Sequence, residues 1–137
     1  MRHHTDTFWT NIVGGSISVI AYLIGGIDNL VVALGILMAI DYISGIMVAT
    51  VDKTVSSKRA FKGLIKKAAM CLAIVVANQL DIVVSGGSFL RNAMLLSFIG
   101  SEGMSIIENL GHLGVKVPTK ISKAFAQLQD KNDKRGE

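Results

Sequence analysis

Residues 30–51 read LVVALGILMAIDYISGIMVATV, an apolar stretch that contains one charged residue, Asp41. A helix of this length rises about 33 Å, enough to cross the hydrocarbon core of a bilayer, which is about 30 Å thick. No Lys or Arg occurs between His3 and Asp52. A soluble helix needs charged residues on the side that faces water, so such a gap favours lipid as the solvent. This stretch predicts a membrane-spanning helix.

Three more apolar stretches extend the prediction to an all-α integral membrane protein with four transmembrane helices. Lys and Arg are also absent from residues 68–90 and 92–115. The predicted spans are about 8–26, 30–51, 64–84 and 89–111. Glycine and serine dilute the first span, whose alternatives are a cleaved signal peptide and a peripheral amphipathic helix.

The composition supports a single membrane domain, residues 1–129. The chain has 137 residues, of which 50% are apolar and 18% charged, and this excludes a largely disordered protein. Its net charge of +4 accompanies no nucleic-acid-binding signature, and the basic residues cluster beside apolar spans. Anionic lipid headgroups are therefore the predicted partners of these basic residues.

The segments between the spans differ in character. Residues 25–29 and 85–88 are short and glycine-rich, which predicts tight turns between antiparallel helices. The loop 52–67 is basic, and its apolar residues recur at helical spacing, which predicts an interfacial amphipathic helix capped by Ser56 or Ser57. Its predicted headgroup-binding residues are Lys58, Arg59, Lys62, Lys66 and Lys67.

The distribution of basic residues predicts the orientation of the chain. With four spans, the amino terminus, the loop 52–67 and the tail share one side, which holds 13 of the 14 Lys and Arg residues. The positive-inside rule places that side in the cytoplasm, with both termini inside. If the first span does not cross, only the amino terminus moves outside.

The carboxyl-terminal segment divides into two parts. Pro118 opens a predicted amphipathic helix over residues 118–129, which would lie on the inner leaflet or pack on a neighbouring subunit. Residues 130–137 are nearly all polar or charged, and we predict a disordered tail there.

Two acids are predicted to lie deep in the membrane, Asp41 in the second span and Glu102 in the fourth. An acid at the bilayer centre costs about 2.5–3.5 kcal/mol, so it needs a partner, water or a function. No Lys or Arg in the spans is expected to reach them. They would therefore be protonated and hydrogen-bonded between helices, or would line a water-filled lumen, together with Glu108 and Asn109 near the inner end.

At the outer end, Asp81 and Arg91 flank the turn 85–88, and we predict an ion pair between them. Small residues four apart predict close helix–helix contacts and a homo-oligomer. These residues are Gly14, Ser18, Gly35, Ala39, Gly45, Ala49, Ala69, Ala73 and Ala77.

The sequence contains none of the common catalytic motifs, and it has no Cys/His cluster with metal-ligand spacing. Cys71 is the only cysteine, so the chain forms no internal disulfide. We expect neither an enzyme nor a bound metal or cofactor.

Several segments, in order, resemble the phage-lysis and toxin-secretion holin family, which includes clostridial toxin-release holins. The resemblance covers about residues 30–128. Its carriers are residues 41–45 (DYISG), 56–58 (SSK), 61–67 (FKGLIKK), 90–93 (LRNA), 102–109 (EGMSIIEN) and 114–118 (GVKVP).

The resemblance implies a protein that accumulates in the bacterial inner membrane and assembles into lesions. Such lesions release an endolysin for host lysis, or a toxin, without required direct contact between the holin and its cargo. We expect Asp41 and Glu102 to be buried in dilute subunits and to turn toward a common lumen on assembly. The alternatives are a small oligomeric ion channel or transporter subunit, and a membrane scaffold protein.

Overall fold

The computed structural model describes residues 3–133, and over these residues the fold is all-α, as predicted. The predicted tight turns lie between the first two helices and between the third and fourth. The helices are α1 (His3–Leu23), α2 (Asn29–Val51), α3 (Ser57–Val84), α4 (Phe89–His112) and α5 (Thr119–Asp133).

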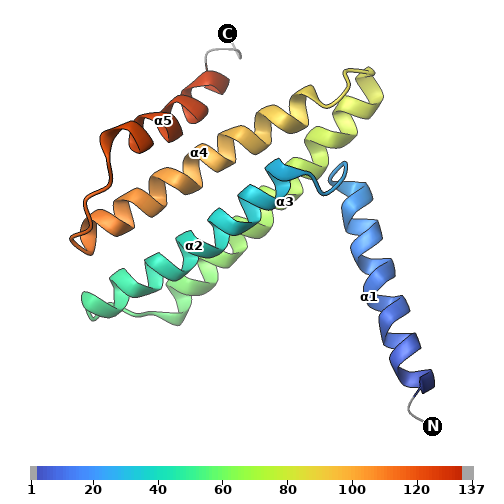
Figure 1. The fold of residues 1–137 in the computed structure, drawn as a ribbon, viewed down its shortest axis with the longest axis horizontal. Coiled ribbons are helices and arrows are strands. Elements are labelled where there is room, and N and C mark those ends of the chain that lie inside the picture. The colour runs from blue at the N-terminus through green and yellow to red at the C-terminus, as the bar shows by residue number, and fades with distance from the viewer. Residues whose placement is uncertain (1–2, 134–137) are drawn as a thin grey trace.

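Helices α2, α3 and α4 run side by side and form the body of the molecule, and α5 covers α4 from the other side (Figure 1). The small core between them consists of Leu34, Ile74, Leu95 and Ile99. Large apolar side chains such as Ile36 and Leu72 point outward and are more than half exposed. An apolar exterior around a narrow core is what a helix bundle in lipid requires.

Helix α1 extends away from this bundle, as Figure 1 shows, and within the described residues its only sizeable helix–helix contact is with α3. The turn after α1 is held against the bundle. Asn78 of α3 donates a hydrogen bond to the carbonyl of Leu23 at 3.0 Å. Gly25 has φ +79°, and a Cβ there would collide with the side chains of Asn78 and Arg91, so this position requires glycine.

Two helices, rather than the predicted four, are long and apolar enough to be membrane spans by composition. These are α2 and α3, whereas the apolar part of α1, Trp9–Leu23, is shorter. Helix α4 has the length of a span, but Arg91, Glu102 and Glu108 reduce its hydropathy. The sequence prediction gave too little weight to these charges.

The structure joins the predicted interfacial helix to the third span, because α3 begins at Ser57 and continues without a break to Val84. Ser56 stands at the N-cap position, but its side chain makes no capping hydrogen bond. Helix α5 continues to Asp133, into the tail for which we predicted disorder, and residues 134–137 lie outside the described part of the chain.

Candidate functional site

A buried group of three charged side chains connects the three helices of the bundle. Lys67 of α3 lies between Asp41 of α2 and Glu102 of α4, and its Nζ forms ion pairs with both carboxylates. The Nζ–Oδ2 distance to Asp41 is 2.8 Å. Glu102 is 2% exposed at its side chain, Lys67 12% and Asp41 20%. We call this group the ion-pair triad.

Asn109 and Ser44 complete the surroundings of Asp41. The amide nitrogen of Asn109 donates to Asp41 Oδ1 at 3.3 Å and to Ser44 Oγ at 2.9 Å, and Ser44 donates to the Asp41 carbonyl at 3.0 Å. The structure therefore brings Asp41 together with Asn109 directly and with Glu102 through Lys67. Glu108 is exposed and does not join them.

The prediction that no cation reaches the two acids is wrong, because Lys67, which we predicted to bind lipid headgroups, pairs with both of them inside the bundle. Lys67 is the eleventh residue of α3, so it lies about 15 Å along the helix from Ser57. Its neighbours on the buried face are Met70, Ile74 and Ala77. That spacing was visible in the sequence and would have separated Lys67 from the exposed residues Lys58, Arg59, Lys62 and Lys66.

Arg91 forms a second buried polar cluster at the opposite end of the bundle. Its side chain is 2% exposed and reaches the turn between α1 and α2. There its Nε donates to the carbonyl of Ile24, and its Nη2 donates to the carbonyl of Gly26 at 3.0 Å. Its Nη1 lies 2.7 Å from Asp28 Oδ2. One arginine thus holds the α1–α2 turn against α4.

The predicted ion pair between Asp81 and Arg91 is not formed, because Asp28 is the carboxylate that pairs with the guanidinium. Asp81 instead accepts hydrogen bonds from the backbone N–H groups of Leu90 at 2.9 Å and Arg91 at 2.8 Å. These N–H groups belong to the first turn of α4 and have no partner within the helix. Asp81 of α3 therefore caps α4.

Asp28 lies outside the apolar helices and has two functions. Its Oδ1 caps α2 by accepting from the N–H groups of Leu30 and Val31, while its Oδ2 pairs with Arg91. The hydrogen bond from Arg91 is the largest cause that lowers the pKa of Asp28 below its usual value of 3.8, although burial opposes it.

The small residues predicted for helix packing have different environments. Gly45 faces Asn109, and Ala77 is buried in the bundle. Gly14, Ser18, Gly35, Ala39 and Ala69 lie on exposed surfaces, whereas Ala49 and Ala73 are half-buried. The sequence reasoning missed Gly100 and Gly103 of α4, where α5 approaches so closely that a Cβ would meet it.

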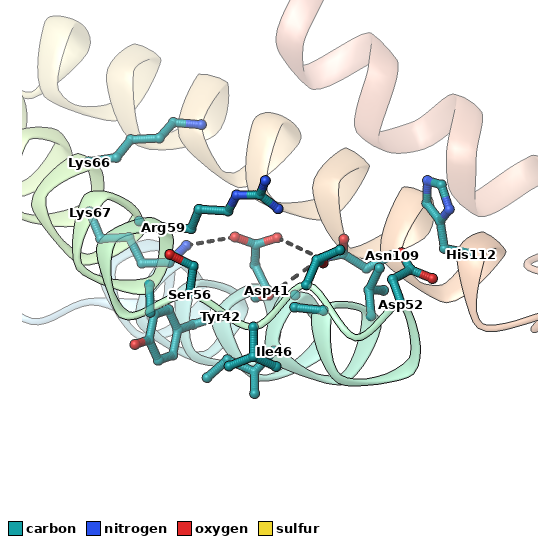
Figure 2. A pocket seen from close by; sticks show the side chains of 17 residues that line it. Asp41, Tyr42, Ile46, Asp52, Ser56, Arg59, Lys66, Lys67, Asn109 and His112 are labelled. Atoms are coloured by element: carbon teal, nitrogen blue, oxygen red, sulfur yellow. Dashed lines mark hydrogen bonds and ion pairs between the residues drawn. The ribbon is translucent and has the colours of Figure 1, made fainter.

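A pocket of about 470 Å³ opens beside the ion-pair triad, between the end of α2, the start of α3 and the end of α4. Figure 2 shows Asp41 at its centre, with Asn109 and His112 from α4 and Arg59 from α3 around it. The pocket gives Asp41 access to solvent from this end. Within residues 3–133, no three His, Cys, Asp or Glu side chains are placed to bind a metal.

The family model described as the bacteriophage holin family matches residues 18–130 of this chain. The chain belongs to the bacteriophage holin family. The matched segment includes α2, α3 and α4 whole and α5 as far as Asp130, so it contains the ion-pair triad and the Arg91 cluster.

Curated proteins from phages and bacteria are similar to this chain. A probable holin of Bacillus phage phi105 is 35% identical over 117 residues, which cover 85% of this chain and 86% of the relative. An uncharacterized protein of Listeria innocua is 36% identical over 74% of this chain and 72% of its own length. An uncharacterized protein of Clostridium perfringens is 30% identical over 82% of this chain and 84% of its own length. No solved structure matches this chain.

Proposed function

We propose that this chain is a phage holin that oligomerises in the bacterial inner membrane and forms lesions through which an endolysin leaves the cytoplasm. Membership of the holin family and the similarity to the probable holin of Bacillus phage phi105 support this role. The role requires membrane insertion and self-association, and it requires no catalytic step by this chain.

The observation that supports the lesion most directly is the ion-pair triad. Moving charged groups out of water costs several kcal/mol per ion, and their mutual attraction repays only part of this cost. The triad contains two carboxyl groups but only one ammonium group, so full ionisation leaves one excess negative charge in the bundle. A water-filled lumen would hydrate all three groups, and this gain favours assembly.

This mechanism differs in one respect from the one expected from the sequence. Asp41 and Glu102 have a partner in the single subunit, so unpaired acids are not the force that drives assembly. The driving force that we propose is hydration of the paired triad. The pocket beside Asp41 provides the route by which water first reaches it.

The proposed topology has four crossings, with both termini in the cytoplasm. Helices α2 and α3 qualify as spans by composition. The charges of Arg91 and Glu102 in α4 are paired inside the bundle, which lowers the cost of a crossing by α4. Helix α1 would cross separately, beside the bundle. This arrangement leaves 12 of the 14 Lys and Arg residues on the cytoplasmic side, with Lys67 inside the bundle and Arg91 at its outer end.

Expression together with a cytoplasmic muralytic enzyme in a bacterium tests the proposed function. We expect a sudden fall in culture turbidity and release of the enzyme, whereas either protein alone leaves the turbidity unchanged, because the cell wall is not degraded. Depolarisation without enzyme release would indicate an ion channel instead. An unchanged membrane potential together with stable turbidity would indicate a scaffold.

Two matched variants test the triad in the same assay. Glu102→Gln removes one charge from the triad, while Glu108→Gln changes an exposed acid two turns further along α4. We expect Glu102→Gln to delay or abolish lysis, because a neutral Asp41–Lys67 pair gains less from hydration. Glu108→Gln should lyse at the normal time. Normal lysis by Glu102→Gln would exclude the triad from the mechanism.

A further inference from the structure

The contact between α4 and α5 brings two helices unusually close together. A Cβ on Gly100 would lie 2.8 Å from the backbone nitrogen of Gln129 and 2.8 Å from the carbonyl oxygen of Phe125. A Cβ on Gly103 would collide with the Phe125 ring. Gly100 and Gly103 are one turn apart, so they form a shallow depression on α4 against which another helix can pack closely. We call it the glycine face.

The outward side of α5 is largely polar, with Ile121 as an exposed apolar residue near its start. Phe125 and Leu128 point inward and pack against the core of the bundle. The exposed residues of α5 include Lys120, Lys123, Gln127, Gln129 and Asp130. Helix α5 is thus amphipathic, with its apolar side on α4 and its charged side directed away from the bundle.

The docked position of α5 conflicts with a membrane crossing by α4. Gly100 precedes His112 by twelve residues, so it lies about 18 Å along the helix from the inner end. Half of the hydrocarbon core is only about 15 Å thick. When α4 crosses the membrane, a docked α5 would place Gln129 and Asp130 beside acyl chains near the bilayer centre. Ionised groups at that depth are costly, so lipid weakens the docked state that the apolar contacts of Phe125 and Leu128 hold, and α5 can then be displaced.

We propose that α5 is an autoinhibitory strap, that is, a helix that covers the glycine face of α4 and blocks self-association. In lipid, α5 leaves this face, and α4 of a second copy of the chain binds there. The inference rests on the crossing by α4 in the proposed function. A second copy suits the glycine face because it presents the same two glycines, so that two backbones approach closely around a twofold axis. Released, α5 lies on the inner leaflet, where its lysines meet anionic headgroups.

The test measures contacts between copies in membranes from cells that express the full chain. In a Cys71→Ser background, Leu96→Cys places a thiol on α4 one turn before Gly100, and oxidation then links copies whose glycine faces meet. Phe125→Ala loosens α5 without altering the glycine face. We expect Phe125→Ala to raise the fraction of linked copies at equal expression and to make lysis earlier. The equilibrium between α5 and a second copy on the glycine face should shift by about tenfold toward the second copy.

Three further variants make the result specific. Ile121→Ala shortens an apolar residue of the same helix that is 47% exposed, and it should leave the linked fraction unchanged. Gly103→Val fills the depression, so it should reduce the linked fraction to background although it also displaces α5. Protease protection of α2 and α3 shows whether each variant inserts. Phe125→Leu, which keeps most of the apolar contact, should lie between wild type and Phe125→Ala.

The strap is refuted if Phe125→Ala leaves the linked fraction unchanged or lowers it, or if Gly103→Val still links. A lower fraction would mean that α5 supports the assembly, for example by lining its lumen. The readout does not depend on lysis. A wild type that links but never releases the muralytic enzyme therefore contradicts the proposed function alone, and normal lysis with unaffected linking contradicts the strap alone.

Discussion

A single amine holds two carboxylates at the centre of this protein, and every helix of the bundle contributes one group to that contact. Lys67 comes from α3, Asp41 from α2 and Glu102 from α4. Among the described residues, no buried side-chain nitrogen or oxygen is left without a hydrogen-bond partner. The buried charges of the bundle are therefore tolerated because each has a specific neighbour, and removal of one partner leaves the others buried without compensation.

Lys67→Met tests this dependence. It leaves Glu102 buried without a counter-charge, and removing one partner of a buried ion pair costs about 3–5 kcal/mol. We expect a clear fall in the free energy of unfolding, measured by denaturant titration in detergent micelles. Lys66→Met removes an exposed neighbour and should change stability by less than about 0.5 kcal/mol. Equal effects of the two changes would contradict a structural role for the triad.

Asp28 predicts a dependence of stability on pH. Its pKa is lowered in the folded state by Arg91, so its contribution is complete above the usual value of 3.8 and is lost as the pH falls through the lower folded value. We expect unfolding in detergent at acidic pH to include a step below pH 3.8 that is absent from Asp28→Asn. Identical pH profiles for both proteins would show that the pair with Arg91 does not stabilise the fold.

At the scale of helices, the chain connects neighbouring elements by capping one helix from another. Asp28 caps α2 and is held by Arg91 of α4, while Asp81 of α3 caps α4. The turn between α3 and α4 is sharp, and Ser85 ends α3 in the left-handed region with φ 53°. The buried carboxylate of Asp81 thus fixes the position at which α4 begins.

Asp81→Ala should loosen the first turn of α4. Two N–H groups lose their acceptor, and that of Arg91 is buried, where an unsatisfied donor costs about 1–3 kcal/mol. We expect faster hydrogen exchange at Leu90 and Arg91 and a lower free energy of unfolding. Gln79→Ala, an exposed change on the same helix, serves as the control. Unchanged exchange at both amides would mean that Asp81 does not cap α4.

For the molecule as a whole, topology is the property on which the functional proposals depend. Single cysteines in a Cys71→Ser background, labelled from either side of the membrane, would test it. Ser88→Cys, in the turn after α3, should react from outside in spheroplasts, whereas Thr54→Cys and Ser122→Cys should react only in inverted vesicles. Labelling of Ser122→Cys from outside would show that α4 does not cross and would also remove the basis for the strap.

The sequence by itself determined the helical class, the apolar stretches of α2 and α3, the positions of the turns and the residues that carry the family resemblance. These properties depend on composition and spacing within one segment, and they can therefore be predicted without knowing what lies beside it. That Asp41 needs a polar partner could be inferred for the same reason, since a polar residue far from both ends of a span requires one.

Only the tertiary structure decided which partner each group has. Lys67 joins the acids because of the rotation of α3 about its axis, and Arg91 pairs with Asp28, 63 residues away in the chain, because of the register of α4 against the α1–α2 turn. Gly100 and Gly103 are significant because α5 folds back onto them. Helix rotation, register and long-range docking are set by how whole surfaces fit together, and this fit is not encoded in the spacing within any one segment.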